Sequence, residues 1–179
     1  MAPSVAGAGF DRLVAECQRL AGMGLRYQYG SGHPASGGLD CSGTVQYVMS
    51  RQGMSGMPRT ASAQFVHLQE QGTLTLVPPG ATAHWILSRA RPGDLLFWRG
   101  TYATGRWPDV SHVMIYLGID RRDGRPMMFG ASTRTGKGIN GHGVDIYEFK
   151  PVKPGGKGQL IGFGSVPGLN APPRQWVAR

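Results

Sequence analysis

The run DCSGTVQYVM, residues 40–49, decides how this chain folds. It has a cysteine near its start, and its apolar residues recur at helical spacing until Gly53. The glycine-rich segment Ser31–Leu39 precedes it, so we expect Cys41 in the first turn of a helix that follows a flexible loop. The free N–H groups and the dipole of a helix N-terminus stabilise an anion. The stretch therefore predicts a reactive cysteine whose thiolate is stabilised by a helix.

Two further helices are expected around this run. Phe10–Ala21 has apolar residues at i, i+3 and i+4 spacing, and Ala61–Gln71 follows the sequence Pro-Arg-Thr. Cys17 lies on the apolar face of the first of these helices, where we expect a small buried hydrophobe. From residue 95 onward the chain changes to short β-type runs separated by turn residues. The expected strands are Leu95–Trp98, Val113–Gly118, Pro126–Ala131, Val144–Phe149 and Leu160–Val166.

This order of elements predicts the fold class. Helices first and a meander of strands afterwards indicate an α+β fold, with the N-terminal helices packed on one face of an antiparallel β-sheet. The length of 179 residues suits one domain, so we expect a single domain over residues 1–179, with its core at residues 10–166 and a C-terminal tail at 167–179. The apolar runs are only a few residues long, which predicts no membrane insertion.

Charge and cysteine content narrow the function classes. Nineteen Lys and Arg against ten Asp and Glu give a net charge of +9, which suits a polyanion such as nucleic acid or bacterial cell wall. The basic residues are scattered without a nucleic-acid-binding signature, so no specific nucleic-acid partner is expected. Two cysteines, with no Cys-x-x-Cys or His-Glu-x-x-His pattern, predict neither a disulfide framework nor a metal site. Residues 1–10 lack the basic and apolar regions of a secretory signal peptide.

A cysteine nucleophile needs a base, and the chain offers five histidines. His112 begins the apolar run HVMIYLG at residues 112–118, and the start of a strand is rigid enough to aim an imidazole. The other histidines are expected in loops, turns or a helix. On spacing alone the choice of His112 stays open, because a lone histidine is more often structural.

Five blocks of sequence, in the same order, resemble the NlpC-type cell-wall cysteine peptidases, and together they span over half of the chain. The blocks are YQYG (27–30), DCSG (40–43), PRTASAQ (58–64), RPGDLLF (91–97) and SHVMIYLG (111–118). The resemblance implies a papain-like α+β fold with the nucleophile at a helix N-terminus. It also implies hydrolysis of amide bonds in peptidoglycan stem peptides, commonly between γ-D-glutamate and meso-diaminopimelate. No metal or organic cofactor is then needed.

The resemblance also implies roles for individual residues. Cys41 becomes the nucleophile, and His112 the base that later protonates the leaving amine. Backbone N–H groups near the helix start would form an oxyanion hole. Asp40 and Ser42 match positions that bind the end of the stem peptide, and Tyr29 matches a tyrosine beside the thiol. Two other readings stay open, a helix N-cap for Asp40 and core packing for Tyr29.

The chain departs from the family pattern after the strand that begins with His112. The family commonly has a third polar residue there, which orients the imidazole, whereas this chain has Gly130. We expect a backbone carbonyl or a water molecule to orient His112, then Ser132, then His142, in that order. The segments Val77–Ala90 and Arg99–Val110 are also longer than usual in the family and should border the cleft.

These observations predict a cysteine endopeptidase or amidase that acts on peptidoglycan in the periplasm or outside the cell. A short basic catalytic domain without a signal peptide favours an antibacterial effector, for instance of type VI secretion, delivered by a signal-independent route. A cognate immunity protein that plugs the cleft would then be its partner. The alternatives are a resident or phage-derived wall hydrolase, a Cys–His acyltransferase or amidase on another substrate, and an inactive wall-binding module.

Overall fold

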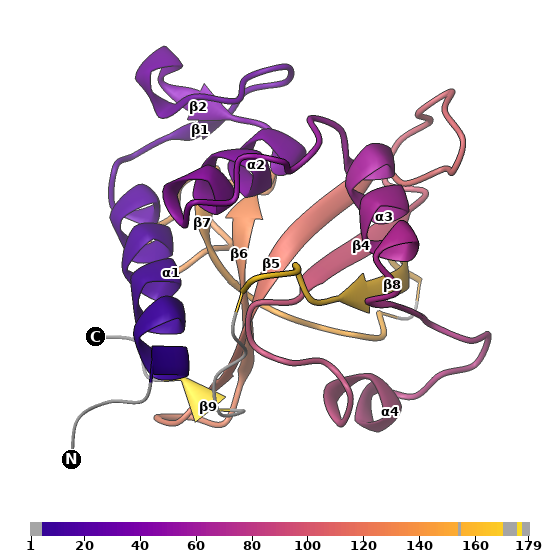
Figure 1. The fold of residues 1–179 in the computed structure, drawn as a ribbon. Coiled ribbons are helices and arrows are strands. Elements are labelled where there is room, and N and C mark those ends of the chain that lie inside the picture. Colours follow the sequence, from indigo (N-terminus) through magenta and orange to yellow (C-terminus); the bar gives the residue numbers. More distant parts are fainter. Residues whose placement is uncertain (1–4, 154, 170–174, 177–179) are drawn as a thin grey trace.

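The computed structural model describes residues 5–153, 155–169 and 175–176, with four α-helices and nine strands (Figure 1). The helices are α1 (Val5–Ala21), α2 (Cys41–Arg51), α3 (Ala61–Glu70) and α4 (Ala83–Leu87). The first strands are short: β1 (Arg26–Tyr27), β2 (Gly38–Leu39) and β3 (Leu74–Leu76). The others are β4 (Leu95–Arg99), β5 (His112–Asp120), β6 (Pro126–Ala131), β7 (Val144–Glu148), β8 (Gln159–Gly164) and β9 (Gln175–Trp176).

One antiparallel sheet forms the centre of the fold, in the order β3-β8-β4-β5-β6-β7. The central strand β5 pairs with β4 so that His112 lies opposite Trp98, and with β6 so that Ile115 lies opposite Phe129. The short strand β9 adds to β5 in parallel. A separate parallel pair, β1 and β2, brings together the two ends of the loop that precedes Cys41.

Both faces of the sheet are covered, which explains the nearly continuous apolar run of β5. Figure 1 shows α1, α2 and α3 grouped together and α4 apart from them. The core beneath α1–α3 contains Leu13, Val45 and Val113, all fully buried. A second core, on the other face, packs Ile86 of α4 against Tyr116. The catalytic candidates therefore lie at the start of α2 and at the start of β5, on a sheet that is packed from both sides.

The expected α+β fold is confirmed, and the differences lie in short elements. The expected loop Val77–Ala90 contains α4, whose N-cap Thr82 accepts a hydrogen bond from the backbone N–H of Trp85. The tail also departs from expectation, because residues 175–176 form β9, while 170–174 and 177–179 lie outside the described residues. Within the described ranges, no helix is long and apolar enough to cross a membrane.

Candidate active site

Cys41 is the first residue of α2, and Asp40 is the N-cap of that helix. The backbone of Asp40 is extended (φ −91°, ψ 175°), and its Oδ1 accepts a hydrogen bond of 2.7 Å from the N–H of Gly43. A Cβ at Gly43 would collide with the carbonyl oxygen of Ser31, so glycine lets the preceding loop pack against the first turn. The DCSG sequence therefore places the thiol at the N-terminus of α2. The loop that precedes this helix packs against its first turn.

The carboxylate of Asp40 is fully engaged within the protein. Its Oδ2 accepts hydrogen bonds from the N–H of Gly30 (2.9 Å) and from Arg59 (2.6 Å), and its Oδ1 accepts a further one from Arg59 (3.0 Å). Arg59 also donates to the hydroxyl of Ser42 (3.1 Å). The N-cap reading of Asp40 is thus correct, and Asp40 and Ser42 meet at Arg59. Sequence reasoning assigned no role to Arg59, although it stands in the PRTASAQ block.

A buried glutamine connects this turn to α3. The side-chain amide of Gln64 donates to the carbonyls of Ser42 (3.0 Å) and Pro58 (2.8 Å). Because Gln64 is fully buried, these bonds fix α3 relative to the start of α2. Gln64 also belongs to the PRTASAQ block, but its partners are distant in sequence and could not be read from it.

The thiol of Cys41 is buried, with 5% of the residue exposed. Burial raises its pKa to about 11, while hydrogen bonds from the N–H groups of Val113, Ser42 and Cys41 itself act in the opposite direction. The bond from Val113 brings the sulfur to the start of β5, next to His112 in the chain. These N–H groups offset part of the effect of burial, and the thiol with a pKa of about 11 is protonated at neutral pH.

His112 is half-buried, and its ring lies 5.6 Å from the ring of Trp98, centroid to centroid, at an angle of 50°. Burial, and then the positive charge of Arg134, lower the pKa of His112 to about 4. The imidazole is therefore neutral at pH 7 and free to accept a proton. Both pKa shifts oppose an ion pair of a thiolate and an imidazolium at this position.

Within the described part of the chain, no side chain is hydrogen-bonded to the ring of His112 in place of the third polar residue. A Cβ at Gly130 would lie 3.0 Å from Cγ of Met114, so Met114 fills the space beside that position. The hydroxyl of Ser132 accepts a hydrogen bond from the N–H of Arg134 (3.2 Å). No hydrogen bond to the ring of His112 is found among the residues that the structure describes, and its aromatic neighbour is Trp98.

His142 is placed differently from Ser132. Its Cε1 lies 3.9 Å from a Cβ built on Gly24, in the turn after α1, and its N–H donates to Asp145 (3.1 Å). Its carbonyl accepts a hydrogen bond from Tyr147 (2.9 Å). These contacts hold His142 in the β6–β7 loop near the end of α1, and the structure does not join it to His112.

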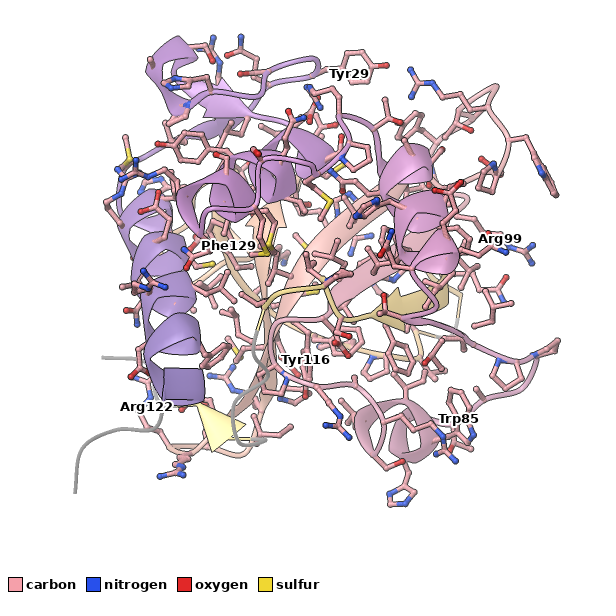
Figure 2. The ribbon with its side chains drawn as sticks, in the orientation of Figure 1. Tyr29, Trp85, Arg99, Tyr116, Arg122 and Phe129 are labelled. Atoms are coloured by element: carbon pink, nitrogen blue, oxygen red, sulfur yellow. The ribbon has the colours of Figure 1, made fainter. Side chains whose placement is uncertain are left out.

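Tyr27 and Tyr102 lie near the thiol, and Tyr29 lies in the loop that precedes it. Tyr29 is 70% exposed and projects from the loop after β1 (Figure 2), so the core-packing alternative for it is wrong. Burial, and then the interaction with Cys41, raise the pKa values of Tyr27 and Tyr102, so both phenols lie near the sulfur. Tyr102 lies in the long segment Arg99–Val110. That segment was expected at the cleft, but only the structure identifies the residue that reaches it.

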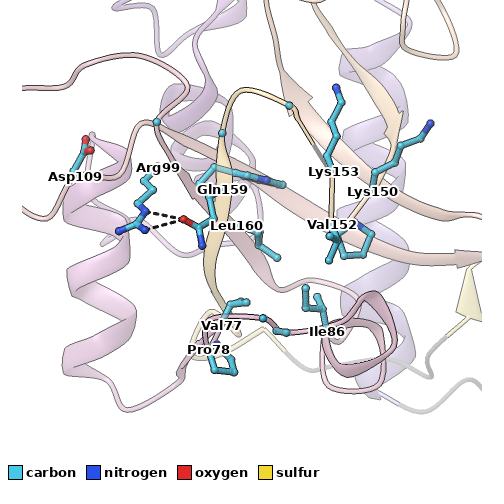
Figure 3. Close-up of a pocket in the computed structure, with 17 residues that line it drawn as sticks. Val77, Pro78, Ile86, Arg99, Asp109, Lys150, Val152, Lys153, Gln159 and Leu160 are labelled. Atoms are coloured by element: carbon cyan, nitrogen blue, oxygen red, sulfur yellow. Dashed lines mark hydrogen bonds between the residues drawn. The ribbon is translucent and has the colours of Figure 1, made fainter.

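A hollow of about 640 Å³ lies apart from this site (Figure 3). Trp98, Ile86 and Leu160 line it, and Arg99 at its rim donates hydrogen bonds of 3.0 and 2.8 Å to Oε1 of Gln159. Its lining includes neither Cys41 nor His112. The hollow is therefore separate from the thiol, and Trp98 is the residue that it shares with the surroundings of His112.

Comparison with known proteins gives the same family as the five sequence blocks. The sequence model of the NlpC/P60 family matches residues 24–150. A probable endopeptidase p60 of Listeria innocua is 32% identical over 154 residues, which are 86% of this chain and 24% of the relative. The bifunctional muramidase/DL-endopeptidase CwlT of Bacillus subtilis is 35% identical over 112 residues, which are 63% of this chain and 28% of the relative. The chain thus spans about a quarter of the length of these curated relatives.

The comparison with a solved structure supports the fold of this chain and nothing beyond the fold. It is a protein of the NLP/P60 family from Staphylococcus aureus, described as similar to a lipoprotein, with a TM-score of 0.53 and 23% identity. The match covers 79% of this chain and 36% of that protein. The fold is the papain-like α+β fold that the sequence blocks imply.

Proposed function

The chain belongs to the NlpC/P60 family, and on that premise we propose that it is a cysteine endopeptidase acting on peptidoglycan stem peptides. One observation carries the proposal: Cys41 is the first residue of α2, and the backbone N–H of Val113, the residue that follows His112, lies near enough to lower the pKa of its thiol. A thiol at a helix N-terminus beside a neutral imidazole is the arrangement that nucleophilic catalysis requires. The bond that we assign is the amide between γ-D-glutamate and diaminopimelate, in agreement with the DL-endopeptidase named among its relatives.

The chemistry follows from the two pKa shifts. As Sγ of Cys41 attacks the carbonyl carbon, its proton passes to the imidazole of His112. The negative charge that develops on the carbonyl oxygen is stabilised by N–H groups at the start of α2. The imidazolium then protonates the leaving amine, and the resulting thioester is hydrolysed by water with His112 again acting as base. Burial opposes charge on both groups at rest, which favours concerted proton transfer.

The substrate side of the site divides into two parts. Tyr29 and Tyr102 are exposed enough to contact a bound peptide directly. Asp40 and Ser42 are buried and act through Arg59, whose guanidinium holds both of them. We therefore assign Asp40 and Ser42 as positioning residues for the substrate end of the cleft and Tyr29 as a contact residue.

Digestion of purified peptidoglycan, followed by mass spectrometry of the fragments, tests the proposal. The wild type should release fragments cut between γ-D-glutamate and diaminopimelate, and Cys41→Ala should release none while keeping its circular dichroism spectrum. Cys17→Ser is the matched control, because it changes the other thiol and should keep the products. Substantial digestion by Cys41→Ala would refute the assignment of the nucleophile, and a different cleaved bond would correct the substrate.

Delivery as an antibacterial effector stays a prediction, and so does the immunity protein that it implies. The test is expression of the chain in bacteria with and without an added periplasmic signal peptide. Toxicity confined to the periplasmic form, and absent from Cys41→Ala, would support it. Equal and negligible toxicity in both compartments would favour the resident or phage-derived hydrolase. Turnover of a non-wall amide or acyl acceptor alone would favour the Cys–His acyltransferase or amidase alternative.

A further inference from the structure

The hollow shown in Figure 3, with a volume of about 640 Å³, is built in part by two long segments of the chain. Val77–Ala90 contributes Val77 and Ile86 to its lining, and Arg99–Val110 contributes Arg99. The first segment was expected at the cleft, whereas its helix α4 packs into the second core, on the other face of the sheet. The volume of the hollow is within the range of sites that hold small molecules.

The base of the hollow is apolar and is held by a packed core. Ile86 and Leu160, which line the hollow, are both buried in the second core. Trp98, which also lines it, is half-buried, and its ring lies 6.2 Å from that of Phe149, centroid to centroid. Such contacts between rings restrict the movement of the indole. An apolar surface that is already fixed can receive the apolar body of a ligand without first having to be ordered.

The charged side chains around the hollow are mostly basic. Arg99, Lys150 and Lys153 line it, and Asp109 is the one carboxylate among the described residues of its lining. Figure 3 shows Arg99 on one side and the two lysines on the other. The guanidinium of Arg99 donates to the amide oxygen of Gln159, which carries no charge, so this contact leaves its positive charge uncompensated.

The two lysines are also poorly neutralised. Nζ of Lys150 lies 3.8 Å from Oε2 of Glu148, and 62% of the Lys150 side chain is exposed, so water screens this pair. Lys153 forms no ion pair with any residue that the structure describes. Like charges that share one hollow repel one another, and an anion placed among them offsets that repulsion. The lining therefore favours a ligand that carries a negative charge beside an apolar group.

We propose that this hollow is a second binding site of the protein, which takes a small organic anion with an apolar body. The apolar body packs on Trp98 and Ile86, and the acidic group lies among Arg99, Lys150 and Lys153. A long polyanion with evenly spaced charges would leave the apolar base of the hollow unused. The hollow lies apart from the catalytic site, so the inference is independent of the proposed function.

Fluorescence titration of the full chain with anilinonaphthalene sulfonate, an organic anion with an apolar body, tests the inference. Phenylnaphthylamine is the comparison probe, because it has the same aromatic framework without the acidic group. The wild type should bind the sulfonate about tenfold more tightly than the amine.

A double variant, Lys150→Gln with Lys153→Gln, tests the part played by the basic side chains. It should bind the sulfonate about tenfold more weakly than the wild type, because each exposed charge contact contributes a few-fold in affinity. Its affinity for the amine should be unchanged. Because both lysines are exposed, the variant should keep the melting temperature of the wild type.

The matched control, Arg12→Gln with Arg121→Gln, removes two exposed basic side chains that do not line the hollow and changes the net charge by the same amount. It should bind the sulfonate as the wild type does. Equal affinities of the wild type for the two probes would overturn the inference, because the acidic group would then play no part. An equal loss in both double variants would also overturn it, since net charge alone would account for binding. Binding to vesicles of anionic lipid without binding of the free sulfonate would exclude a small-molecule site.

Discussion

Replacing Arg59 with methionine tests how the start of α2 is held. The variant keeps the apolar length of the side chain but removes three hydrogen bonds, two to Asp40 and one to Ser42. Asp40 then retains the N–H groups of Gly30 and Gly43 as donors and loses its countercharge. We expect lower stability and a lower kcat/KM, because the same carboxylate caps the helix that bears Cys41.

The magnitude follows from burial. Removing one partner of a fully buried ion pair costs about 3–5 kcal/mol, because a charge is left uncompensated. The side chain of Arg59 is 36% exposed and that of Asp40 9%, so water screens the pair and replaces part of what is lost. We therefore expect a decrease of about 2 kcal/mol in the free energy of unfolding. For a domain of this size that corresponds to a melting temperature lower by about 4–8 °C.

Urea denaturation of four proteins measures the effect: the wild type, Arg59→Met, Asp40→Asn and the double variant. The double variant should be more stable than the sum of the two single losses predicts, because no unpaired charge remains. Arg19→Met is the control, since Arg19 pairs with Glu16 on the surface of α1 and should cost less than about 1 kcal/mol. A loss below about 0.5 kcal/mol in Arg59→Met, or strict additivity in the double variant, would refute this account of the site.

Three further outcomes are expected. Cys17→Ser should lower the free energy of unfolding by about 1–3 kcal/mol, because it buries a hydroxyl in the core, and full stability by urea denaturation would contradict this. Trp98→Leu should lower kcat by about tenfold by freeing the ring of His112, with Trp98→Phe restoring most of it, whereas equal kcat values in both variants would exclude a ring contact. The pKa of His112 is lower in the folded chain (about 4) than its ordinary 6.5, so the unfolded chain binds the proton more tightly. The free energy of unfolding should therefore fall as the pH decreases from 6.5 towards 4, and this part of the slope should be absent in His112→Asn.

The sequence was most informative where a pattern repeats over several turns or residues. The helix that starts at Cys41 and ends before Gly53 and the strand at Pro126–Ala131 were predicted close to their observed bounds, whereas the helix predicted to begin at Phe10 begins at Val5. Elements of two to five residues, such as β1 and α4, are too short for a period to be recognised. The strand β1 forms because β2 pairs with its backbone, and α4 forms because Thr82 caps it and Ile86 packs into the second core.

Some contacts of the candidate site could be predicted from the sequence and others could not, depending on how far apart in the chain the two residues lie. Cys41 and Asp40 are neighbours in the chain, so a helix start and its N-cap could be recognised together. The contacts of Arg59 with Asp40, and of Tyr102 with the surroundings of Cys41, join residues that are distant in sequence. Such pairings depend on how loops of particular length close over the helix, and neither composition nor periodicity encodes that.

The packing of Met114 beside Gly130 also constrains how the sequence at this site can change. A polar side chain introduced at position 130 alone would meet Met114, whose Cγ lies 3.0 Å from the position of a Cβ there. Shortening Met114 alone would leave a cavity beside the base. The two positions are therefore coupled: a side chain at position 130 requires Met114 to move, so the effect of a substitution at one position depends on the residue at the other.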